Sequence, residues 1–194
     1  MEILKQYLDT ISPLENETWE SVKQLFIETK LNKGDYFIEE GPIAKQIGFL
    51  FEGVVRAFYR SNEGNEYNKT FFTAPCMIGG YSSLITAKPN LINQQALTDC
   101  KLWVADYKPL CNFYNTHPDL ERIARKLAEF YFVDKEKREI EIVLLDADKR
   151  YRIFKEEHPE LEQLIPQYHI ASYLGITPTQ LSRIRSGDQK KIIF

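Results

Sequence analysis

Polar residues near the carboxyl end have the types and spacing that suit contact with DNA bases. Thr179, Gln180, Ser182 and Arg183 stand close together in a short predicted helix. At 100° per residue, Thr179 and Arg183 point almost opposite to apolar Leu181, so the outward face of the helix is polar. Arginine donates two parallel hydrogen bonds to the O6 and N7 edge of guanine, whereas threonine and glutamine offer single bonds, a methyl contact or a fork to adenine. We therefore predict that Arg183 is the principal base reader of a DNA-binding helix.

Basic residues around this helix could hold the DNA backbone. Arg185, Lys190 and Lys191 are predicted to bind phosphates, and Thr177 completes the predicted DNA-contacting set. Residues 149–194 hold eight Lys/Arg and five Asp/Glu, a net charge of +3, whereas the whole chain carries −3. The rest of the chain is therefore acidic, and only the carboxyl-terminal part has the sign that phosphate attracts.

The segment 165–185 has the chemistry of two short helices that meet at a tight turn. Gly175 suits the left-handed conformation that ends the first helix. Thr177 can cap the second helix, and Pro178 fits its first position. Apolar residues of both halves share the inward faces, namely Ile170, Leu174, Ile176, Leu181 and Ile184. The pattern predicts a helix-turn-helix, although a generic helical hairpin remains an alternative for two short helices.

Upstream, the pattern changes from helical spacing to short β-rich runs. Residues 1–30 have a helical pattern with apolar residues on one face. From Leu31 to about Tyr107, the β-rich runs are separated by turns that contain glycine and asparagine. The predicted strands are 36–38, 47–51, 54–59, 67–72, 95–97 and 102–105. Many short strands at close spacing predict a sandwich or a roll.

A long helix is predicted to begin at Pro118. Its apolar residues recur at spacings of three and four, as in a coiled coil, and are Leu120, Ile123, Leu127 and Phe130. The charged run 134–139 interrupts this stripe, so the seam cannot be continuous. We predict that the four apolar residues form a dimer interface. The alternative is a core helix that packs on the chain's own sheet.

Two amino-terminal runs, Lys33–Gly41 and Ile47–Phe58, resemble the cyclic-nucleotide-binding β-roll in the spacing of their glycines. With the long helix and the segment 171–185, the chain resembles the Crp/Fnr family of transcription regulators over most of its length. The resemblance implies an α+β fold. Its parts would be an amino-terminal double-stranded β-roll of the jelly-roll type, a long dimerisation helix and a carboxyl-terminal winged helix-turn-helix.

The resemblance also implies domains and partners. It assigns 1–117 to a cyclic-nucleotide-binding-like sensor, 118–147 to the central dimerisation helix and 148–194 to the DNA-binding domain. It implies a homodimer that binds a pseudo-palindromic site in double-stranded DNA, and it admits RNA polymerase as a further partner. The predicted function is that of a DNA-binding transcriptional regulator of the Crp/Fnr type.

The chain departs from the cyclic-AMP-binding members at the ligand pocket. Those members have Gly-Glu followed by Arg-Ser or Arg-Thr, whereas this chain has Gly79-Gly80 and Asn90-Leu91. Without the arginine and the glutamate, the charge-assisted bonds to the cyclic phosphate and the ribose are lost, so we predict that cyclic AMP does not bind well. Gly79, Gly80, Ser82 and Ser83 form a candidate pocket for another anion, with a vestigial turn as the alternative.

The predicted recognition helix departs from the family pattern as well. Pro178-Thr179 stands where activators that read the best-known half-site of this family carry an Arg-Glu pair, while Arg183 is retained. The target sequence is therefore expected to differ.

The sequence gives no support for a metal site, a cofactor or an enzyme. The three cysteines, Cys76, Cys100 and Cys111, have no Cys-x-x-Cys spacing. No cysteine precedes Cys76 to hold the iron-sulfur cluster of the oxygen-sensing branch. The histidines are too scattered for a metal motif. No nucleophile elbow or phosphate-cradling loop occurs, so we expect no catalysis.

Location and mode of action are the last expectations. No apolar run approaches the length of a membrane helix, and the amino terminus lacks the pattern of a secretory signal, so we expect a cytoplasmic protein without a membrane partner. The alternative function is a cyclic-nucleotide-binding-like module that acts through protein contacts without specific DNA binding. Salt-dependent DNA binding separates the two functions.

Overall fold

The computed structural model describes residues 1–191 and the side chains of residues 1–187. The chain divides into two compact units. The roll unit consists of Met1–Ala57 and Phe71–Val133, and the carboxyl-terminal unit consists of Phe58–Thr70 and the chain from Asp134 onward. Among the described residues, no helix is long and apolar enough to cross a membrane.

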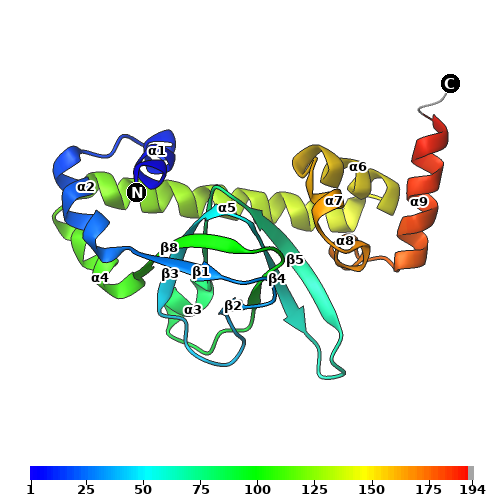
Figure 1. Ribbon diagram of the computed structural model, residues 1–194, viewed down its shortest axis with the longest axis horizontal. Coiled ribbons are helices and arrows are strands. Elements are labelled where there is room, and N and C mark those ends of the chain that lie inside the picture. Colours follow the sequence, from blue (N-terminus) through cyan, green and yellow to red (C-terminus); the bar gives the residue numbers. More distant parts are fainter. Residues whose placement is uncertain (192–194) are drawn as a thin grey trace. The chain divides into compact units, whose positions relative to one another are not determined.

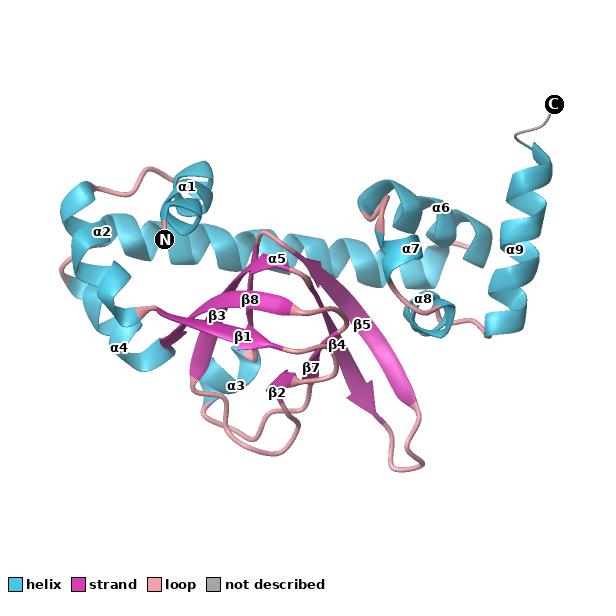
Figure 2. Cartoon of the chain, viewed as in Figure 1, coloured by secondary structure: helices cyan, strands magenta, loops and turns pink. Residues whose placement is uncertain are grey.

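Within residues 1–191, eight strands form two four-stranded sheets that make up a β-roll (Figures 1 and 2). The strands are β1 (Ile27–Leu31), β2 (Tyr36–Ile38), β3 (Gln46–Glu52), β4 (Val54–Arg60), β5 (Glu66–Thr73), β6 (Cys76–Gly79), β7 (Asn93–Ala96) and β8 (Cys100–Asp106). One sheet has the order β1-β8-β3-β6, and the other has the order β2-β7-β4-β5. Phe49 in the middle of β3 lies opposite Trp103 on one side and Met77 on the other, both in antiparallel register. The predicted α+β fold with an amino-terminal roll is confirmed.

All six predicted strands are present, and β1 and β6 are additional. The sequence pattern missed β1 because this strand lies at the edge of its sheet and carries exposed Glu28 and Lys30, so it lacks a regular apolar alternation. The turn between β3 and β4 requires its glycine. Gly53 has a φ of +100°, and a Cβ there would lie 2.5 Å from the carbonyl oxygen of Asp99.

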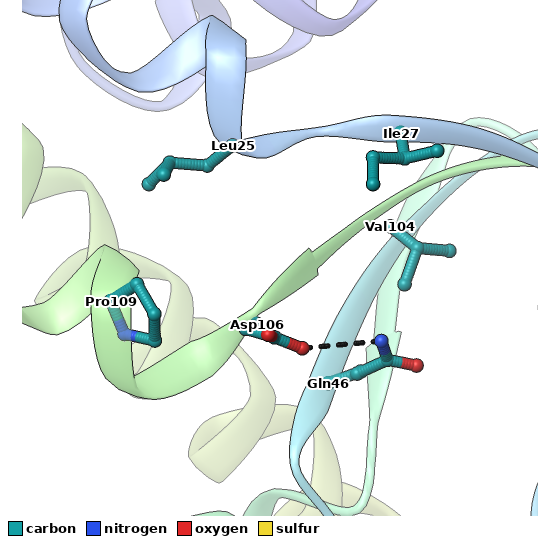
Figure 3. Close-up of a pocket in the computed structure, with 6 residues that line it drawn as sticks. All are labelled: Leu25, Ile27, Gln46, Val104, Asp106 and Pro109. Carbon is teal, nitrogen blue, oxygen red and sulfur yellow. Dashed lines mark hydrogen bonds between the residues drawn. The ribbon is translucent and has the colours of Figure 1, made fainter.

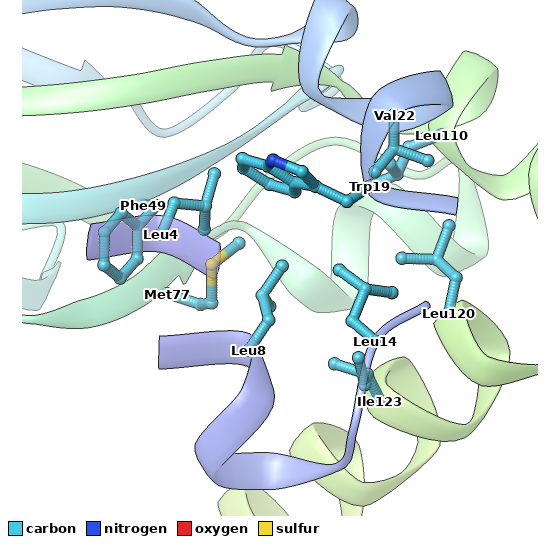
Figure 4. Close-up of a cluster of buried hydrophobic side chains, with 10 residues drawn as sticks. All are labelled: Leu4, Leu8, Leu14, Trp19, Val22, Phe49, Met77, Leu110, Leu120 and Ile123. Carbon is cyan, nitrogen blue, oxygen red and sulfur yellow. The ribbon is translucent and has the colours of Figure 1, made fainter. Parts of the chain in front are cut away.

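The amino-terminal helices share one core with the first sheet (Figure 4). The helices of the roll unit that precede the long helix are α1 (Glu2–Ile11), α2 (Asn16–Val22), η1 (Lys23–Leu25), α3 (Tyr81–Thr86), α4 (Tyr107–Asn112) and η2 (Phe113–Asn115). The buried members of the shared core are Leu4, Leu8, Leu14, Trp19, Val22, Phe49, Met77, Leu110, Leu120 and Ile123. The core therefore includes the first turns of the long helix as well as the sheet.

The long helix, α5 (Pro118–Leu144), begins inside this core. Leu120 and Ile123 are 5% and 2% exposed, and Leu127 packs against the same cluster. The prediction that these residues form a dimer interface is therefore corrected, because Leu120 and Ile123 are buried within the chain and Leu127 is half-buried against the same core. Phe130, the fourth member of the predicted set, is 64% exposed. For the first turns of α5, the alternative of a core helix describes the packing.

After α5, the described part of the carboxyl-terminal unit is helical. It contains α6 (Ala147–Glu157), α7 (Leu161–Leu164), α8 (Gln167–Leu174) and α9 (Pro178–Lys191). Between Tyr107 and Lys191, the described chain forms no strand, so the wing included in the predicted helix-turn-helix is absent from these residues.

Candidate nucleic-acid interface

Helices α8 and α9 meet at a tight corner, as the sequence predicts. Gly175 has a φ of +68°, and its N–H donates to the carbonyl oxygen of Ser172 at 3.2 Å. The N–H of Ile176 donates to the carbonyl oxygen of Ala171 at 3.0 Å. This left-handed end of α8 leaves the carbonyls satisfied and lets the chain reverse within a few residues. The corner is packed by Ile170, Leu174 and Leu181, each at most 1% exposed.

A reciprocal cap begins α9. The Thr177 hydroxyl accepts from the N–H of Gln180 at 3.2 Å, and the Gln180 Oε1 accepts from the N–H of Thr177 at 2.9 Å and from the Thr177 hydroxyl at 3.2 Å. This is a capping box with glutamine at the third helical position. Both lone pairs of Gln180 Oε1 are thereby occupied. Gln180 can offer DNA only its Nε2 donors, and the adenine fork considered from the sequence is closed to it while the box is intact.

The outward face of α9 is polar and exposed. Thr179, Ser182 and Arg183 are exposed, whereas Leu181 between them is 1% exposed. Arg183 makes no ion pair or hydrogen bond with the residues whose side chains are described. The structure therefore presents the predicted base reader to solvent on a rigid, capped helix. The side chains of Lys190 and Lys191, predicted phosphate ligands, lie outside the described residues.

Several arginines of the carboxyl-terminal unit form ion pairs or hydrogen bonds with other residues of that unit. Arg185, predicted to bind phosphate, forms an ion pair with Glu162, with 2.8 Å between Nε and Oε1. Arg138 donates to the carbonyl oxygen of Tyr173 and lies over the ring of that residue, 3.9 Å from its centroid. Arg150 donates to the carbonyl oxygen of Leu174 at 2.9 Å. Arg138 and Arg150 thus pair the last carbonyls of α8, and Arg185 attaches α9 to Glu162. The number of cations available to bind phosphates is therefore smaller than the net charge of this part of the chain suggests.

A contact that sequence reasoning missed joins α8 to the β5 edge. The Ser172 hydroxyl accepts from the N–H of Asn68 at 3.0 Å and donates to the carbonyl oxygen of Glu66 at 2.8 Å. In return, the Asn68 Nδ2 donates to the carbonyl oxygen of His169 at 3.0 Å. Asn68 and His169 are both buried, and all four residues belong to the carboxyl-terminal unit. No sequence signal pairs residues about a hundred positions apart.

Comparison with known proteins adds the family context. Residues 28–117 match the family model of the cyclic nucleotide-binding domain. FixK2 from Bradyrhizobium japonicum is 16% identical, with 86% of this chain and 85% of that chain covered and a TM-score of 0.75. The c-di-GMP responsive global regulator CLP from Xanthomonas campestris is 16% identical, with 91% and 93% covered and a TM-score of 0.69. No curated protein matches the chain.

A third similar structure names the family itself. It is a regulator from Eubacterium rectale assigned to the Crp/Fnr family, 19% identical, with 92% of this chain and 85% of that chain covered and a TM-score of 0.70. This chain has the Crp/Fnr fold. The resemblance predicted from the sequence is confirmed at the level of the fold.

In this Crp/Fnr fold, the four predicted pocket residues lie from the end of β6 to the first half of α3, and Gly80 joins the two elements. The Ser83 hydroxyl, 3% exposed, accepts from the N–H of Ala44 at 3.0 Å and donates to the carbonyl oxygen of Lys88. A Cβ on Gly80 would lie 2.9 Å from Asn90 Oδ1. Gly79 and Ser82 complete the set, and Ser82 is exposed. An anion site made of these residues stays a prediction.

Strand β7 gives the second sheet of the Crp/Fnr fold buried polar side chains. Asn93 and Gln94 are 3% and 2% exposed, yet Asn93 Nδ2 and Gln94 Oε1 have no hydrogen-bond partner among the described residues. The Gln94 Nε2 donates to the carbonyl oxygen of Gly79 at 2.9 Å, which links this strand to the predicted pocket. A buried polar atom left unpaired costs about 1–3 kcal/mol.

The roll unit also contains a shallow hollow and three free thiols. The hollow beside β1 is lined by Leu25, Ile27, Gln46, Val104, Asp106 and Pro109, and the Gln46 amide donates to Asp106 at 3.2 Å across it (Figure 3). Burial raises the pKa of the Cys76 thiol to about 12, and Cys76, Cys100 and Cys111 are free thiols. Within the described residues, no three His, Cys, Asp or Glu side chains gather as metal ligands would.

Proposed function

We propose that this protein is a DNA-binding transcriptional regulator of the Crp/Fnr type. The observation that carries the proposal is the exposed polar face of α9, with Arg183 presented to solvent at a helix-turn-helix corner that is capped and packed. Two structures similar to this chain, CLP and the regulator from Eubacterium rectale, are named as regulators and not as enzymes, which supports the same function. A regulator of this kind acts on the chromosome in the cytoplasm, and RNA polymerase is the partner that the family resemblance adds.

Recognition would follow the helix-turn-helix mode. Helix α9 lies in the major groove, where Arg183 binds the O6 and N7 edge of a guanine. Thr179 and Ser182 offer single contacts beside it, and Gln180 donates through Nε2 only. Lys190 and Lys191, whose side chains lie outside the described residues, stay the predicted phosphate ligands. The buried Leu181 and the capping box fix the orientation of α9, so its polar face is ready before DNA arrives.

The proposed homodimer would form through a second apolar face of α5. We call this face the outer stripe and define it as Phe132, Val133, Ile140, Val143 and Leu144, which are 53–79% exposed. Their spacing places them on the side of the helix opposite Leu120, Ile123 and Leu127. Exposed apolar side chains in such a row lose water only when another surface covers them, and a second copy of the same helix supplies a matching one. Paired copies would place two α9 helices about 34 Å apart on DNA.

Selection of binding sites from a random duplex pool tests the proposed function. At a stated salt concentration, the protein is expected to enrich a pseudo-palindromic motif whose half-sites are centred about one helical turn apart, with a fixed guanine in each half. Affinity for the enriched duplex should fall as salt rises. Failure to enrich any motif, together with no salt-dependent binding, would contradict the proposal and favour a module that acts through protein contacts.

We also propose that cyclic AMP is not the effector. Gly80 and Asn90 stand where a glutamate and an arginine are needed, and both are packed against the chain's own atoms. We expect millimolar cyclic AMP to leave the unfolding temperature unchanged, measured by differential scanning fluorimetry, because a ligand that does not bind the folded protein does not stabilise it. A concentration-dependent rise in that temperature would contradict this expectation.

A further inference from the structure

Helix α9 has a third attachment besides its cap and its buried leucine. The Arg185 Nε donates to Glu162 Oε1 at 2.8 Å, and the Tyr151 hydroxyl donates to the same carboxylate oxygen. The three residues come from α9, α7 and α6 respectively, so one carboxylate ties the three helices together. We call this set the ionic anchor. Tyr151 is 3% exposed, and burial, followed by its bond to Glu162, raises the pKa of its hydroxyl, which therefore stays a donor across the neutral range.

The position of Arg185 on the helix separates it from the proposed DNA-binding face. Arg185 follows Arg183 by two residues, a rotation of 200° on an α-helix, and lies one turn after the buried Leu181. Its side chain is 38% exposed, and that of Glu162 is 21% exposed. A guanidinium held by a partly buried carboxylate would have to break a charge-assisted hydrogen bond before it could bind a phosphate.

We propose that Arg185 is a positioning residue of the recognition helix and not a phosphate ligand. The ionic anchor fixes the rotation and tilt of α9 against α6 and α7, and this sets the direction in which Arg183 projects. The proposal rests on the proposed function, because it assigns a role within DNA recognition. It replaces the phosphate role that the sequence suggested for Arg185, and it adds Glu162 and Tyr151 to the residues on which DNA affinity depends.

The two roles of Arg185 predict opposite effects of one substitution. If Arg185 is a positioning residue, Glu162→Gln weakens binding to the selected duplex about three- to tenfold, and Arg185→Gln does the same. The double variant is then no weaker than the weaker single variant, because both substitutions break one interaction. The slope of log affinity against log salt stays at the wild-type value. If Arg185 is a phosphate ligand, Glu162→Gln tightens binding, and Arg185→Gln lowers the slope by about one for each subunit.

Glu160→Gln is the matched control. Glu160 is exposed, precedes α7 directly and makes no side-chain cap, so its substitution removes the same charge beside the same helix without touching the ionic anchor. We expect this variant to bind DNA as the wild type does or slightly more tightly. If Glu162→Gln weakens DNA binding and Glu160→Gln does not, the loss comes from the changed position of α9 and not from the removed charge.

Amide hydrogen exchange in the free protein separates failure of this inference from failure of the proposed function. Without DNA, Glu162→Gln and Arg185→Gln should each raise the exchange rates of residues 181–187 severalfold, while Glu160→Gln leaves them unchanged. A wild-type protein that binds no duplex would overturn the proposed function, yet the exchange would still show whether the anchor holds α9. Unchanged exchange, or tighter DNA binding by Glu162→Gln than by Glu160→Gln, would overturn the positioning role.

Discussion

Arg183→Ala is expected to lower affinity for the selected duplex by about 5- to 150-fold for each half-site, which corresponds to about 1–3 kcal/mol for a lost bidentate contact to guanine. The loss should be accompanied by relaxed specificity at one base pair in each half-site, because Arg183 is the one exposed arginine on the described outward face of α9. Binding is measured by fluorescence anisotropy on the selected duplex and on duplexes with that guanine replaced.

Arg152→Ala is the control for the charge of Arg183. Arg152 is an exposed arginine on α6 in the same unit, so its substitution removes one positive charge without touching α9. We expect it to change affinity by much less than Arg183→Ala and to leave sequence preference intact. Equal losses for both variants, with no change in preference, would mean that Arg183 acts through its charge alone and that another residue reads the bases.

Ile140→Asp should dissociate the dimer. Ile140 is 53% exposed and lies in the middle of the outer stripe of α5. In a two-fold symmetric pair, the substitution places two carboxylates in an apolar seam and removes two isoleucines from it, at a cost of about 3–6 kcal/mol. DNA affinity should fall at the same protein concentrations, because a monomer engages one half-site. Sedimentation velocity and anisotropy on one protein stock measure the two effects together.

The same helix offers a matched control for Ile140→Asp. Ile142 is 55% exposed, but a rotation of 200° places it away from the outer stripe. Ile142→Asp should therefore leave the dimer and DNA affinity intact. A wild-type protein that sediments as a monomer at micromolar concentration would refute the proposed dimer. A substitution such as Leu127→Glu would not test the dimer. Leu127 packs on the core of the roll unit, so its substitution would destabilise the fold.

The features that the sequence predicted well are those with local causes. The corner between α8 and α9 depends on Gly175, Thr177 and Pro178, whose conformational preferences act within a few residues. Six strands of the roll are predictable from the sequence because short β-rich runs are bounded by turn residues. Structure and sequence agree at these places because each residue's own backbone preference decides the outcome.

The features that the sequence predicted poorly depend on distant partners. Leu120 and Ile123 have the spacing of a coiled coil, but the same spacing serves a helix that packs on its own core, and only the position of α1 and α2 decides between them. The apolar residues that resume at Ile140, Val143 and Leu144 are visible in the sequence, but the charged run 134–139 before them hides that they belong to the outer stripe. The sequence predicts a phosphate role for Arg185 because no local pattern indicates that Glu162, 23 residues earlier, is its ion-pair partner.

The bonds between Ser172 and β5 also bear on how the protein could be divided. Strand β5 lies at the edge of its sheet, and the Ser172 hydroxyl covers the N–H of Asn68 and the carbonyl oxygen of Glu66 there. A fragment that stopped before α8 would leave these groups open as a template for another strand. Helix α8 thus also protects the edge of β5 from pairing with another strand, so β5 and α8 are better expressed and engineered as one piece.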